Sequence, residues 1–494
     1  MDVAESNLEA GKTAASSGDT NNDENAASDP FLVDWDGPDD PQNPFNWPTW
    51  VKATNCGLVS ALTFVTPLAS SIFAPGVPSL MRDFHSSDVL IAAFVVSVYV
   101  LGFALGPLLW APLSELYGRV YIYHLCNIMF AGFIVGCALA PTLGALVVFR
   151  FFAGAVGACC LTNGGGSIAD QISQEKRAVA MSAFSIGPLF GPVIGPVIGG
   201  FVQDAKGWRW VFWVLCIIHA SVAVAMVVFM RESYAPVLLE RKAAKLRKET
   251  GDERYKSKLD TGLSGSTLFK RNIIRPLKLL VFSPICTVFA LYMAMVYGYL
   301  YLLFTSVAFV FQQSYHFSTS MVGLVYIGLG VGSLVGMAWF AADSNKAIQK
   351  AKAETGQTRV KPEVRLNLLP HGAIILPVGF FIYGWTADYL THWIAPVIGL
   401  FIIGVGNILC FMTVSVYLVD AYERYAASAL AANTVFRSIA GAVLPLCALD
   451  MYRALGLGWG NSLLAFIAIA FLPAPFLILR FGERLRMKFK VENL

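Results

Sequence analysis

Apolar and polar segments alternate along the chain in a regular way. Twelve apolar runs are each about as long as the roughly 20 residues that a helix needs to cross a bilayer. Six lie before a polar stretch at residues 231–282, and six lie after it. The predicted spans are 53–75, 88–110, 120–140, 142–168, 178–202, 209–230, 283–311, 319–340, 366–386, 392–418, 426–449 and 460–481. The pattern predicts an all-α integral membrane protein with 12 transmembrane helices in two six-helix halves.

The two halves repeat short sequence features at matching places. In the fifth span, Ser-Ile-Gly at 185–187 precedes Gly-Trp at 207–208. In the eleventh span, Ser-Ile at 438–439 precedes Gly-Trp at 458–459. Because the two spans occupy the same place in their halves, the echo indicates a duplicated, pseudo-symmetric architecture. Transporters built from such repeats hold the substrate between the halves, near the middle of the bilayer.

Polarity divides the chain into five predicted regions. Residues 1–50 carry eleven acidic residues and one basic residue, and such a segment cannot bury enough apolar surface to fold. We therefore expect a disordered acidic tail, whose Pro- and Trp-rich end forms an amphipathic approach to the membrane surface. The other regions are an N-terminal half at 51–230, a central loop at 231–282, a C-terminal half at 283–481 and a basic tail at 482–494.

The positive residues indicate how the chain sits in the membrane. If both termini are cytosolic, most of the 36 Lys and Arg residues lie on the cytosolic side, many of them in the central loop. The residues that fall on the other side are Arg82, Lys206, Arg209 and Arg453. This positive-inside distribution predicts a multi-pass protein with two cytosolic tails and a cytosolic central loop.

Composition excludes several classes of function. The chain of 494 residues is 56% hydrophobic and 14% charged, whereas soluble domains carry roughly 25% charged residues. A formal net charge of +4 gives no reason to expect a nucleic-acid partner, and the expected surroundings are the lipid bilayer. The nine cysteines lie in apolar runs without zinc-ligand spacing, so we expect no metal and no cofactor. An enzyme is disfavoured, because no second motif joins the one His-Asp pair at 85–88.

Span 5 holds a run of glycine and proline residues at 187–200. The glycines recur every four residues and share a helix face, on which another backbone can approach closely. The prolines remove backbone hydrogen bonds and bend the helix. The residues are Gly187, Pro188, Gly191, Pro192, Gly195, Pro196 and Gly199. Span 8 carries a similar stripe at Gly328, Gly332 and Gly336, so we predict a tight mechanical contact between spans 5 and 8; ordinary helix packing is the alternative.

The segment after span 2 ends in Glu115, Gly118 and Arg119. A carboxylate and a guanidinium four residues apart at a cytosolic helix end can link neighbouring helices. We interpret them as a latch that opens when the halves move. The alternative is a solvated pair that contributes less than about 1 kcal/mol.

Two arginines lie within spans and are candidates for transport. Arg150 and Arg437 lie at similar depths in spans 4 and 11, where buried charge is costly and functional by default. Each can hold an anionic group or repel a proton from a neighbouring site. Snorkelling, or a structural bond to backbone carbonyls, is the alternative.

Carboxylates are absent from the middle of every predicted span. A proton-coupled carrier needs a group that titrates within the gated region. Asp170 and Asp420, which end spans 4 and 10, are therefore the expected proton-binding groups. The intramembrane alternatives are His124, His219 and His371, each of which can equally be a hydrogen-bonded interior residue.

Polar side chains on apolar spans are candidate walls of a substrate cavity. We predict that these are Asn127, Asn163, Tyr292, Tyr297, Asn407 and Asn433. Phe and Tyr also crowd span 7. An aromatic, weakly polar cavity suits bulky amphipathic or planar compounds better than sugars.

Together these features resemble the major facilitator superfamily, and in particular the fungal twelve-span drug:proton antiporters, which include multidrug, cycloheximide-resistance and polyamine exporters. The resemblance covers about residues 34–485. Residues 112–119 (PLSELYGR) resemble the family motif after span 2, with Glu115 where many relatives have Asp. Residues 150–157 (RFFAGAVG) resemble the motif on span 4, and residues 187–200 resemble the antiporter motif on span 5.

The resemblance implies a secondary active transporter that exports a small amphipathic molecule across the plasma membrane by proton antiport with alternating access. The cargo would be a drug, a toxin or a secondary metabolite. It also implies that Arg150 takes part in proton transfer. We expect a monomer. The alternative is a carrier for a polar metabolite, such as an organic acid or a polyamine, without proton coupling; Arg150 and Arg437 favour an anion over a polycation.

Overall fold

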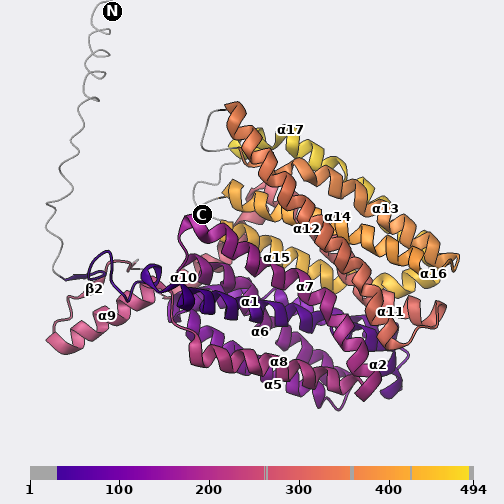
Figure 1. The fold of residues 1–494 in the computed structure, drawn as a ribbon, viewed down its shortest axis with the longest axis horizontal. Helices are drawn as coiled ribbons and strands as arrows, with labels where there is room; N and C mark the ends of the chain where they lie inside the picture. Colours follow the sequence, from indigo (N-terminus) through magenta and orange to yellow (C-terminus); the bar gives the residue numbers. More distant parts are fainter. Residues whose placement is uncertain (1–30, 261, 263–264, 356–360, 423–425, 489–494) are drawn as a thin grey trace, which may run out of the picture.

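The chain forms a bundle of long helices (Figure 1). The computed structural model describes residues 31–488, apart from 261, 263–264, 356–360 and 423–425. The N-terminal half comprises α1 (Thr49–Ser71), η2 (Ala74–Gly76), α2 (Val77–Asp83), α3 (Val89–Phe103), α4 (Gly106–Tyr117), α5 (Arg119–Ala138), α6 (Leu143–Ala169), α7 (Gln174–Lys206) and α8 (Trp208–Phe229).

The C-terminal half repeats this plan. It comprises α11 (Pro284–Ser314), α12 (Thr319–Thr355), η3 (Pro362–Leu368), α13 (Leu369–Asp388), α14 (Ile394–Tyr422), α15 (Ala426–Val443), η5 (Leu444–Cys447), α16 (Ala448–Ala470) and α17 (Pro473–Lys488). Between the halves lie α9 (Ala235–Thr250), β2 (Lys256–Ser257) and α10 (Gly265–Phe282), and before α1 lie β1 (Leu32–Val33) and η1 (Pro44–Asn46).

Within the described residues, 11 helical stretches are long and apolar enough to cross a membrane. The last stretch, Ala426–Arg486, is 61 residues long and contains both the eleventh and the twelfth predicted spans. Gly456 interrupts it with φ 77° and ψ 171°, close to the values of 85° and 169° at Gly207, where α7 gives way to α8. The chain therefore turns at Gly456, two residues before the Gly-Trp pair that the sequence echo indicated, and twelve passes result.

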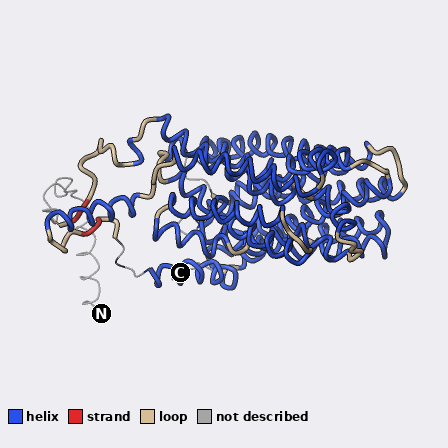
Figure 2. Tube along the Cα trace, turned by 90° about the horizontal axis from the view of Figure 1, so that it is seen from below, coloured by secondary structure: helices blue, strands red, loops and turns tan. Residues whose placement is uncertain are grey.

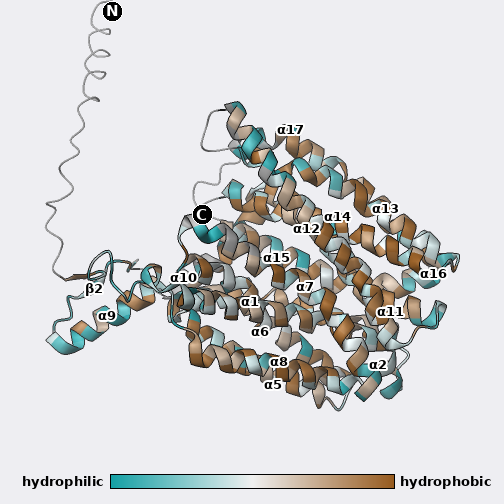
Figure 3. Ribbon diagram, in the orientation of Figure 1, coloured by the Kyte–Doolittle hydropathy of each residue, from teal (hydrophilic) through white to brown (hydrophobic). Residues whose placement is uncertain are grey.

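The bundle has two ends, which Figure 1 separates from left to right. We call the end at which α1 begins and α6 and α14 end the tail side, because α9, α10 and the β1–β2 pair lie there. We call the other end the opposite side. Hydrophobic residues cover most of the bundle, whereas α9 and the end of α12 are largely hydrophilic (Figure 3).

The predicted contact between spans 5 and 8 is confirmed, because α7 packs against α12. The prediction of which glycines make this contact was wrong. A Cβ at Gly191 would lie 2.6 Å from the Phe64 carbonyl oxygen of α1, so this stripe faces α1. A Cβ at Gly328 would lie 2.9 Å from the Val397 carbonyl oxygen of α14, so the second stripe faces α14. Four-residue spacing shows that glycines share a face, but not which neighbour covers it.

Other glycines form the seam between α7 and α12, namely Gly200, Gly323 and Gly330. A Cβ at Gly200 would lie 2.7 Å from the Thr319 carbonyl oxygen, and a Cβ at Gly323 would lie 2.6 Å from the Pro196 carbonyl oxygen. The prolines of α7 leave carbonyl groups without helical donors. The carbonyl of Pro192, which the missing N–H of Pro196 leaves free, accepts a hydrogen bond from the Ser71 hydroxyl at 2.7 Å.

The prediction of a disordered tail over residues 1–50 is wrong for its last part, and residues 1–30 lie outside the described residues. β1 pairs in parallel with β2, and η1 follows before α1 begins. Figure 2 shows these strands beside α9, projecting from the bundle. The reason is charge compensation: Asp34 pairs with Lys258 at 2.6 Å, and Asp36 pairs with Lys242 at 2.6 Å. The composition of residues 1–50 alone could not predict this order, because the partner lysines lie in the central loop.

Candidate transport site

A cavity lies between the two halves. Its volume, counted with its open mouth, is about 700 Å³. The N-terminal half contributes Pro67, Phe103, Leu161, Pro188, Leu189, Pro192 and Val193, and the C-terminal half contributes Tyr297, Leu300, Tyr301, Phe304, Leu329, Ser333, Asn407, Ile408, Phe411 and Arg437.

The two walls differ in chemistry. The side chains from the N-terminal half are all apolar. The wall from the C-terminal half carries the polar groups, which are Tyr297, Tyr301, Ser333, Asn407 and Arg437. The cavity is therefore amphipathic, and it suits a molecule with one apolar face and one polar end.

Arg437 of α15 is the one charged residue among the cavity-lining residues. Its guanidinium carbon lies 4.9 Å from the centre of the Tyr297 ring and 5.1 Å from the centre of the Phe411 ring. Both distances are within the range of cation–π attraction. The Nε atom is buried and has no hydrogen-bond partner in the part of the chain that the structure describes. The rings hold the guanidinium in place without neutralising it.

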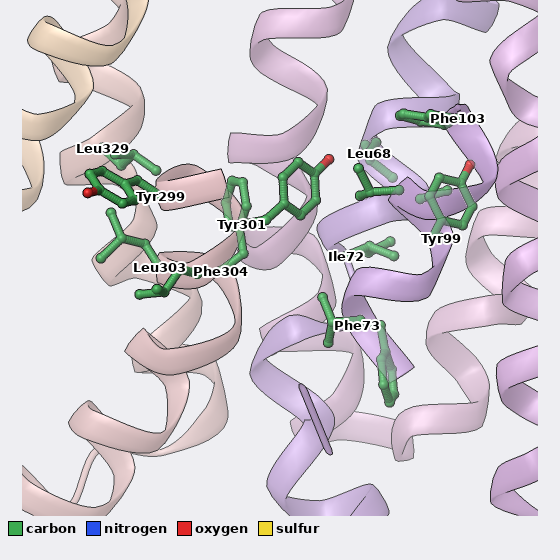
Figure 4. Close-up of a cluster of buried hydrophobic side chains, with 14 of the residues drawn as sticks. Leu68, Ile72, Phe73, Tyr99, Phe103, Tyr299, Tyr301, Leu303, Phe304 and Leu329 are labelled. Atoms are coloured by element: carbon green, nitrogen blue, oxygen red, sulfur yellow. The ribbon is translucent and has the colours of Figure 1, made fainter. Parts of the chain in front are cut away.

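Hydrogen bonds between the halves gather towards the opposite side. The Ser70 and Tyr301 hydroxyls lie 2.9 Å apart, and Gln312 donates to the Pro75 carbonyl at 3.1 Å. The Ser320 backbone N–H donates to the Asp204 carboxylate at 2.8 Å. Figure 4 shows Leu68 of α1 and Ile72, directly after α1, on one side of this boundary and Tyr301 and Phe304 of α11 on the other.

The exposure of the cavity walls shows where the cavity opens. Tyr301 and Phe304 are buried at its closed end, with 1% and 0% of their surface exposed. Leu161, Phe411 and Arg437 are only partly buried. Leu161 lies far along α6, near its end on the tail side. The cavity therefore opens towards the tail side.

Arg150 of α6 lies outside this cavity, with 1% of its surface exposed. One Nη atom donates to the carbonyl oxygens of Ser70 at 3.1 Å and Val96 at 3.4 Å. The rings of Phe73, Tyr99 and Phe212 lie within 6 Å of its guanidinium carbon. These contacts match the alternative of a structural bond to backbone carbonyls, because they join α1 and α3 to α6. Ser70 connects it to Tyr301 and so to the cavity wall.

The predicted latch residues lie where α4 ends and α5 begins. Arg119 pairs with Asp170 at 3.1 Å and donates to the Ser114 hydroxyl at 2.6 Å. Glu232 accepts from the backbone N–H groups of Arg119 and Val120, both at 3.0 Å, at the positive end of the α5 dipole. Asp170, which the sequence placed in the coupling site, thus belongs to the same cluster as the latch.

The geometry of this cluster explains why residue 118 is a glycine. Its φ is 98°, in the region that favours glycine, and a Cβ there would lie 2.5 Å from the Glu232 carboxylate. Burial raises the pKa of the Asp170 carboxyl above its usual value, and the attraction of Arg119 opposes this rise. The negative charges of Glu232 and Glu115 also raise the pKa of Asp170, so the cluster contains several titratable groups around one arginine.

The C-terminal half repeats the ion pair. Arg365 pairs with Asp420 at 2.8 Å and donates to the Ser344 hydroxyl at 3.0 Å. In both halves the Nε atom of the arginine donates to the aspartate, and its Nη1 atom donates to the serine. The two candidate carboxylates therefore both lie on the tail side, each paired with an arginine, and neither lines the cavity.

A model of the Major Facilitator Superfamily matches residues 59–445. The chain belongs to the major facilitator superfamily. It is therefore a multi-pass membrane transporter of a small-molecule substrate and not an enzyme. The prediction of a twelve-span fold of this family is confirmed.

The transporter is similar to several fungal proteins over nearly its whole length. It is 54% identical to the MFS-type transporter penM of Penicillium rubens over 470 residues, which are 95% of this chain and 92% of penM. It is 54% identical to the MFS-type transporter tndD of Aspergillus flavipes, over 94% of this chain and 87% of tndD. It is 49% identical to the efflux pump radE of Floropilus chiversii, over 93% and 85% of the two chains.

A solved structure shares the fold. The xylose transporter XylE from E. coli, in a partially occluded inward open conformation, aligns with a TM-score of 0.63 at 15% identity. The alignment covers 88% of this transporter and 98% of XylE. At this identity the likeness shows the architecture alone.

The predicted cavity residues separate into two groups. Tyr297 and Asn407 line the cavity of the transporter. Asn127, Asn163, Tyr292 and Asn433 do not. Asn163 accepts from Ser114 at 2.9 Å, near the latch, and Tyr292 lies 3.2 Å from the Cys410 sulfur inside the C-terminal half. Sequence reasoning placed polar residues in spans, but it could not determine which face of each span meets the other half.

Two further candidates lie inside the N-terminal half. The His219 ring lies 3.1 Å from the Asn127 carbonyl oxygen, and both residues line a small pocket among α1, α5, α6 and α8. This is the hydrogen-bonded interior role that was the alternative for His219. Asn433 is buried, and its amide oxygen has no partner among the described residues.

Sequence reasoning missed Glu232, Ser333 and Phe411 as members of these sites. One feature of the sequence could have pointed to Glu232, since it is an acidic residue directly after span 6. No sequence feature distinguishes Ser333 and Phe411, because single serines and phenylalanines are common in membrane helices.

Proposed function

We propose that this transporter exports a small amphipathic molecule from the cytosol across the plasma membrane by alternating access, driven by proton antiport. The observation that carries the proposal is the amphipathic cavity between the halves, closed towards the opposite side. Similarity to a fungal protein named as an efflux pump supports the outward direction. The cargo is a secondary metabolite, toxin or drug.

The proposed orientation places the tail side in the cytosol. Central-loop helices α9 and α10 and the end of α17, which carry many of the basic residues, lie on the tail side. The positive-inside rule favours this side as cytosolic. The observed state is then open to the cytosol and ready to load cargo. A single copy encloses the whole cavity, which supports a working monomer.

The proposed coupling uses the two tail-side ion pairs. With the tail side closed, protons entering from outside reach Asp170 and Asp420, and protonation weakens their pairs with Arg119 and Arg365. The raised pKa of Asp170 favours this uptake. Each pair lies within one half, so its release loosens the packing of the tail-side helix ends of that half and favours their rearrangement. Loss of the protons to the cytosol restores the pairs. Gly118 and Glu232 hold Arg119 in position for this exchange.

Expression in an exporter-deficient yeast tests the proposal. The cells are loaded with a panel of hydrophobic dyes, drugs and organic acids, and retention is measured with and without a protonophore. We expect protonophore-sensitive loss of hydrophobic compounds, which is absent from cells expressing an equal amount of the Gly195→Leu variant. Loss that a protonophore does not change would contradict proton coupling. Movement of one polar metabolite alone would favour the polar-metabolite carrier, with Arg437 as its binding residue.

A further inference from the structure

The cavity carries a positive charge without a negative counterpart among its lining residues. Arg437 is charged, and the other residues that line the cavity include no aspartate, glutamate or histidine. No described residue forms an ion pair or hydrogen bond with its guanidinium, whereas Arg119 and Arg365 each have a carboxylate partner. An uncompensated charge in a membrane protein is costly, and a bound ligand of opposite charge removes that cost.

The two rings beside Arg437 favour one kind of ligand. Tyr297 and Phe411 interact with the guanidinium through their faces, at 4.9 and 5.1 Å. These contacts fix the side chain but use none of its N–H groups as hydrogen bonds to oxygen. Planar guanidinium groups pair best with two oxygens that share one negative charge, as in a carboxylate. The same positive charge repels amines and quaternary ammonium compounds.

Two further polar side chains, Asn407 and Ser333, line the same cavity. Asn407 uses its amide nitrogen to donate to the Val296 carbonyl at 2.9 Å, and this bond fixes the orientation of the amide. Ser333 donates to the Leu329 carbonyl at 2.9 Å. Both side chains keep an oxygen that can accept from a hydroxyl group of a ligand. The apolar wall, which includes Pro67, Phe103 and Leu161, faces the remainder of the ligand.

We propose that the cavity selects amphipathic organic anions, with Arg437 as the residue that binds the anionic oxygens and the apolar wall of the N-terminal half as the surface that receives a ring system. This inference deepens the proposed export function and rests on it for direction. It excludes amines as preferred cargo. A binding measurement can test it separately from export.

Binding of matched probes to the purified transporter in lipid nanodiscs tests the inference at pH 7. The probes are 1-pyrenebutyric acid, its methyl ester and the corresponding pyrenylbutyl trimethylammonium ion, with naphthylacetic acid and its methyl ester as a second scaffold. We expect at least one acid to bind about tenfold or more tightly than its ester, and the ammonium ion to bind most weakly. Equal or tighter binding of the esters, or no binding of either acid, would overturn the inference.

Variants assign the preference to Arg437. Arg437→Gln should bring the acid-to-ester ratio of affinities close to one while the ester still binds, and Arg437→Lys should keep part of the preference. Arg453→Gln is the matched control, because Arg453 is an exposed arginine on the opposite side, near Asp450. A preference that survives Arg437→Gln would overturn the assignment. Acid-selective binding without export in yeast would refute the proposed function alone, and export of esters without acid selectivity would refute this inference alone.

Discussion

Arg150 and Arg437 are both arginines inside the membrane, but their surroundings assign them different tasks. Arg150 is fully enclosed and donates to carbonyl oxygens of α1 and α3. Arg437 is partly buried and lines a cavity. A positive charge bonded to neutral carbonyls positions helices, whereas a positive charge facing a cavity attracts an anion. We therefore propose that Arg150 is a positioning residue, which is linked to the cavity wall through Ser70 and Tyr301.

Replacing Arg150 with lysine tests this positioning role. Lysine keeps the charge but has no planar fork, so it cannot contact the Ser70 and Val96 carbonyls in the same way. We expect the purified variant to lose about 1–3 kcal/mol of stability and export to fall at least tenfold. Thermal unfolding in detergent and dye efflux from yeast measure the two effects. Wild-type values in both assays would show that the carbonyl bonds are dispensable.

The Arg119–Asp170 pair allows a double-mutant test. Both side chains are largely buried, so removing one partner leaves an uncompensated charge. We expect Asp170→Asn and Arg119→Gln each to destabilise the transporter by about 3 kcal/mol. The double variant should lose clearly less than the sum, because it removes both charges together. Additive losses in thermal unfolding would mean that the two side chains do not act as a pair.

The raised pKa of Asp170 predicts a pH dependence with a definite sign. A carboxyl whose pKa is raised by folding binds its proton more tightly in the folded than in the unfolded chain. The stability linked to this proton is therefore present at low pH and is lost as the pH rises through the raised pKa. Unfolding temperatures measured from pH 4 upwards should show this loss in the wild type. In Asp170→Asn the loss should be absent, and an unchanged profile would contradict the assignment.

At the scale of elements, the glycine stripe of α7 serves packing within the N-terminal half. A Cβ at Gly191 would lie 2.6 Å from the Phe64 carbonyl oxygen and 2.8 Å from the Leu68 nitrogen. We expect Gly191→Ala to destabilise the transporter by about 1–3 kcal/mol and to reduce export. The matched control is Gly132→Ala on α5, where nothing lies within 4 Å of an added Cβ and alanine favours the helix. Equal stability of the two variants would contradict the α1–α7 contact.

The seam between α7 and α12 should respond differently. A Cβ at Gly323 would lie 2.6 Å from the Pro196 carbonyl oxygen, across the boundary between the halves. Closure towards the opposite side then becomes unfavourable, although each half keeps its own core. We expect Gly323→Ala to lower export more than tenfold with a smaller loss of unfolding temperature than Gly191→Ala. The opposite ranking of the two variants would place the moving contact at α1–α7.

Apolar periodicity predicted the helices of this transporter but not their neighbours. The predicted span 142–168 agrees with α6 to within one residue at each end, since bilayer thickness fixes the length of an apolar run. Asn163 and Asn407 are both asparagines in apolar helices, yet only Asn407 lines the cavity. Which face of a helix meets the other half depends on tertiary packing, and a single sequence carries no direct measure of it.

At the scale of the whole molecule, the connection between the halves is itself structured. α10 contacts α4 of the N-terminal half and α15 of the C-terminal half, so it crosses the tail-side boundary. Upstream of it, β2 and α9 are held by the segment before α1. Asp40 is buried and accepts from the backbone N–H groups of Asp36 at 2.9 Å and Gln42 at 2.8 Å. The N-terminal segment and the central loop therefore form one unit, from which α10 emerges.

Charges hold this unit together over a defined pH range. The hydrogen bond from Lys258 lowers the pKa of the Asp34 carboxyl, and the Asp36 backbone N–H lowers the pKa of Asp40. A lowered pKa means that the linked stability is present above the usual aspartate value of about 4 and is lost as the pH falls through the lowered pKa. The unit should therefore be intact at cytosolic pH. The exposed ion pairs within it should weaken as salt is raised.

Charge reversal at Lys242 tests whether this unit matters for transport. Lys242 lies 2.6 Å from Asp36 and 3.8 Å from Asp40, so Lys242→Glu places three negative charges together. We expect β1 to separate from β2, trypsin to cleave faster at the basic residues 254–258, and export to fall several-fold because the start of α10 is no longer held. Adding Asp36→Lys to Lys242→Glu should restore protection in part. Lys245→Glu on the same helix is the control, since Lys245 is exposed and pairs only with Glu249 at 3.7 Å among the described residues. If cleavage rises while export stays unchanged, the unit does not position α10, and the halves move independently of their connection.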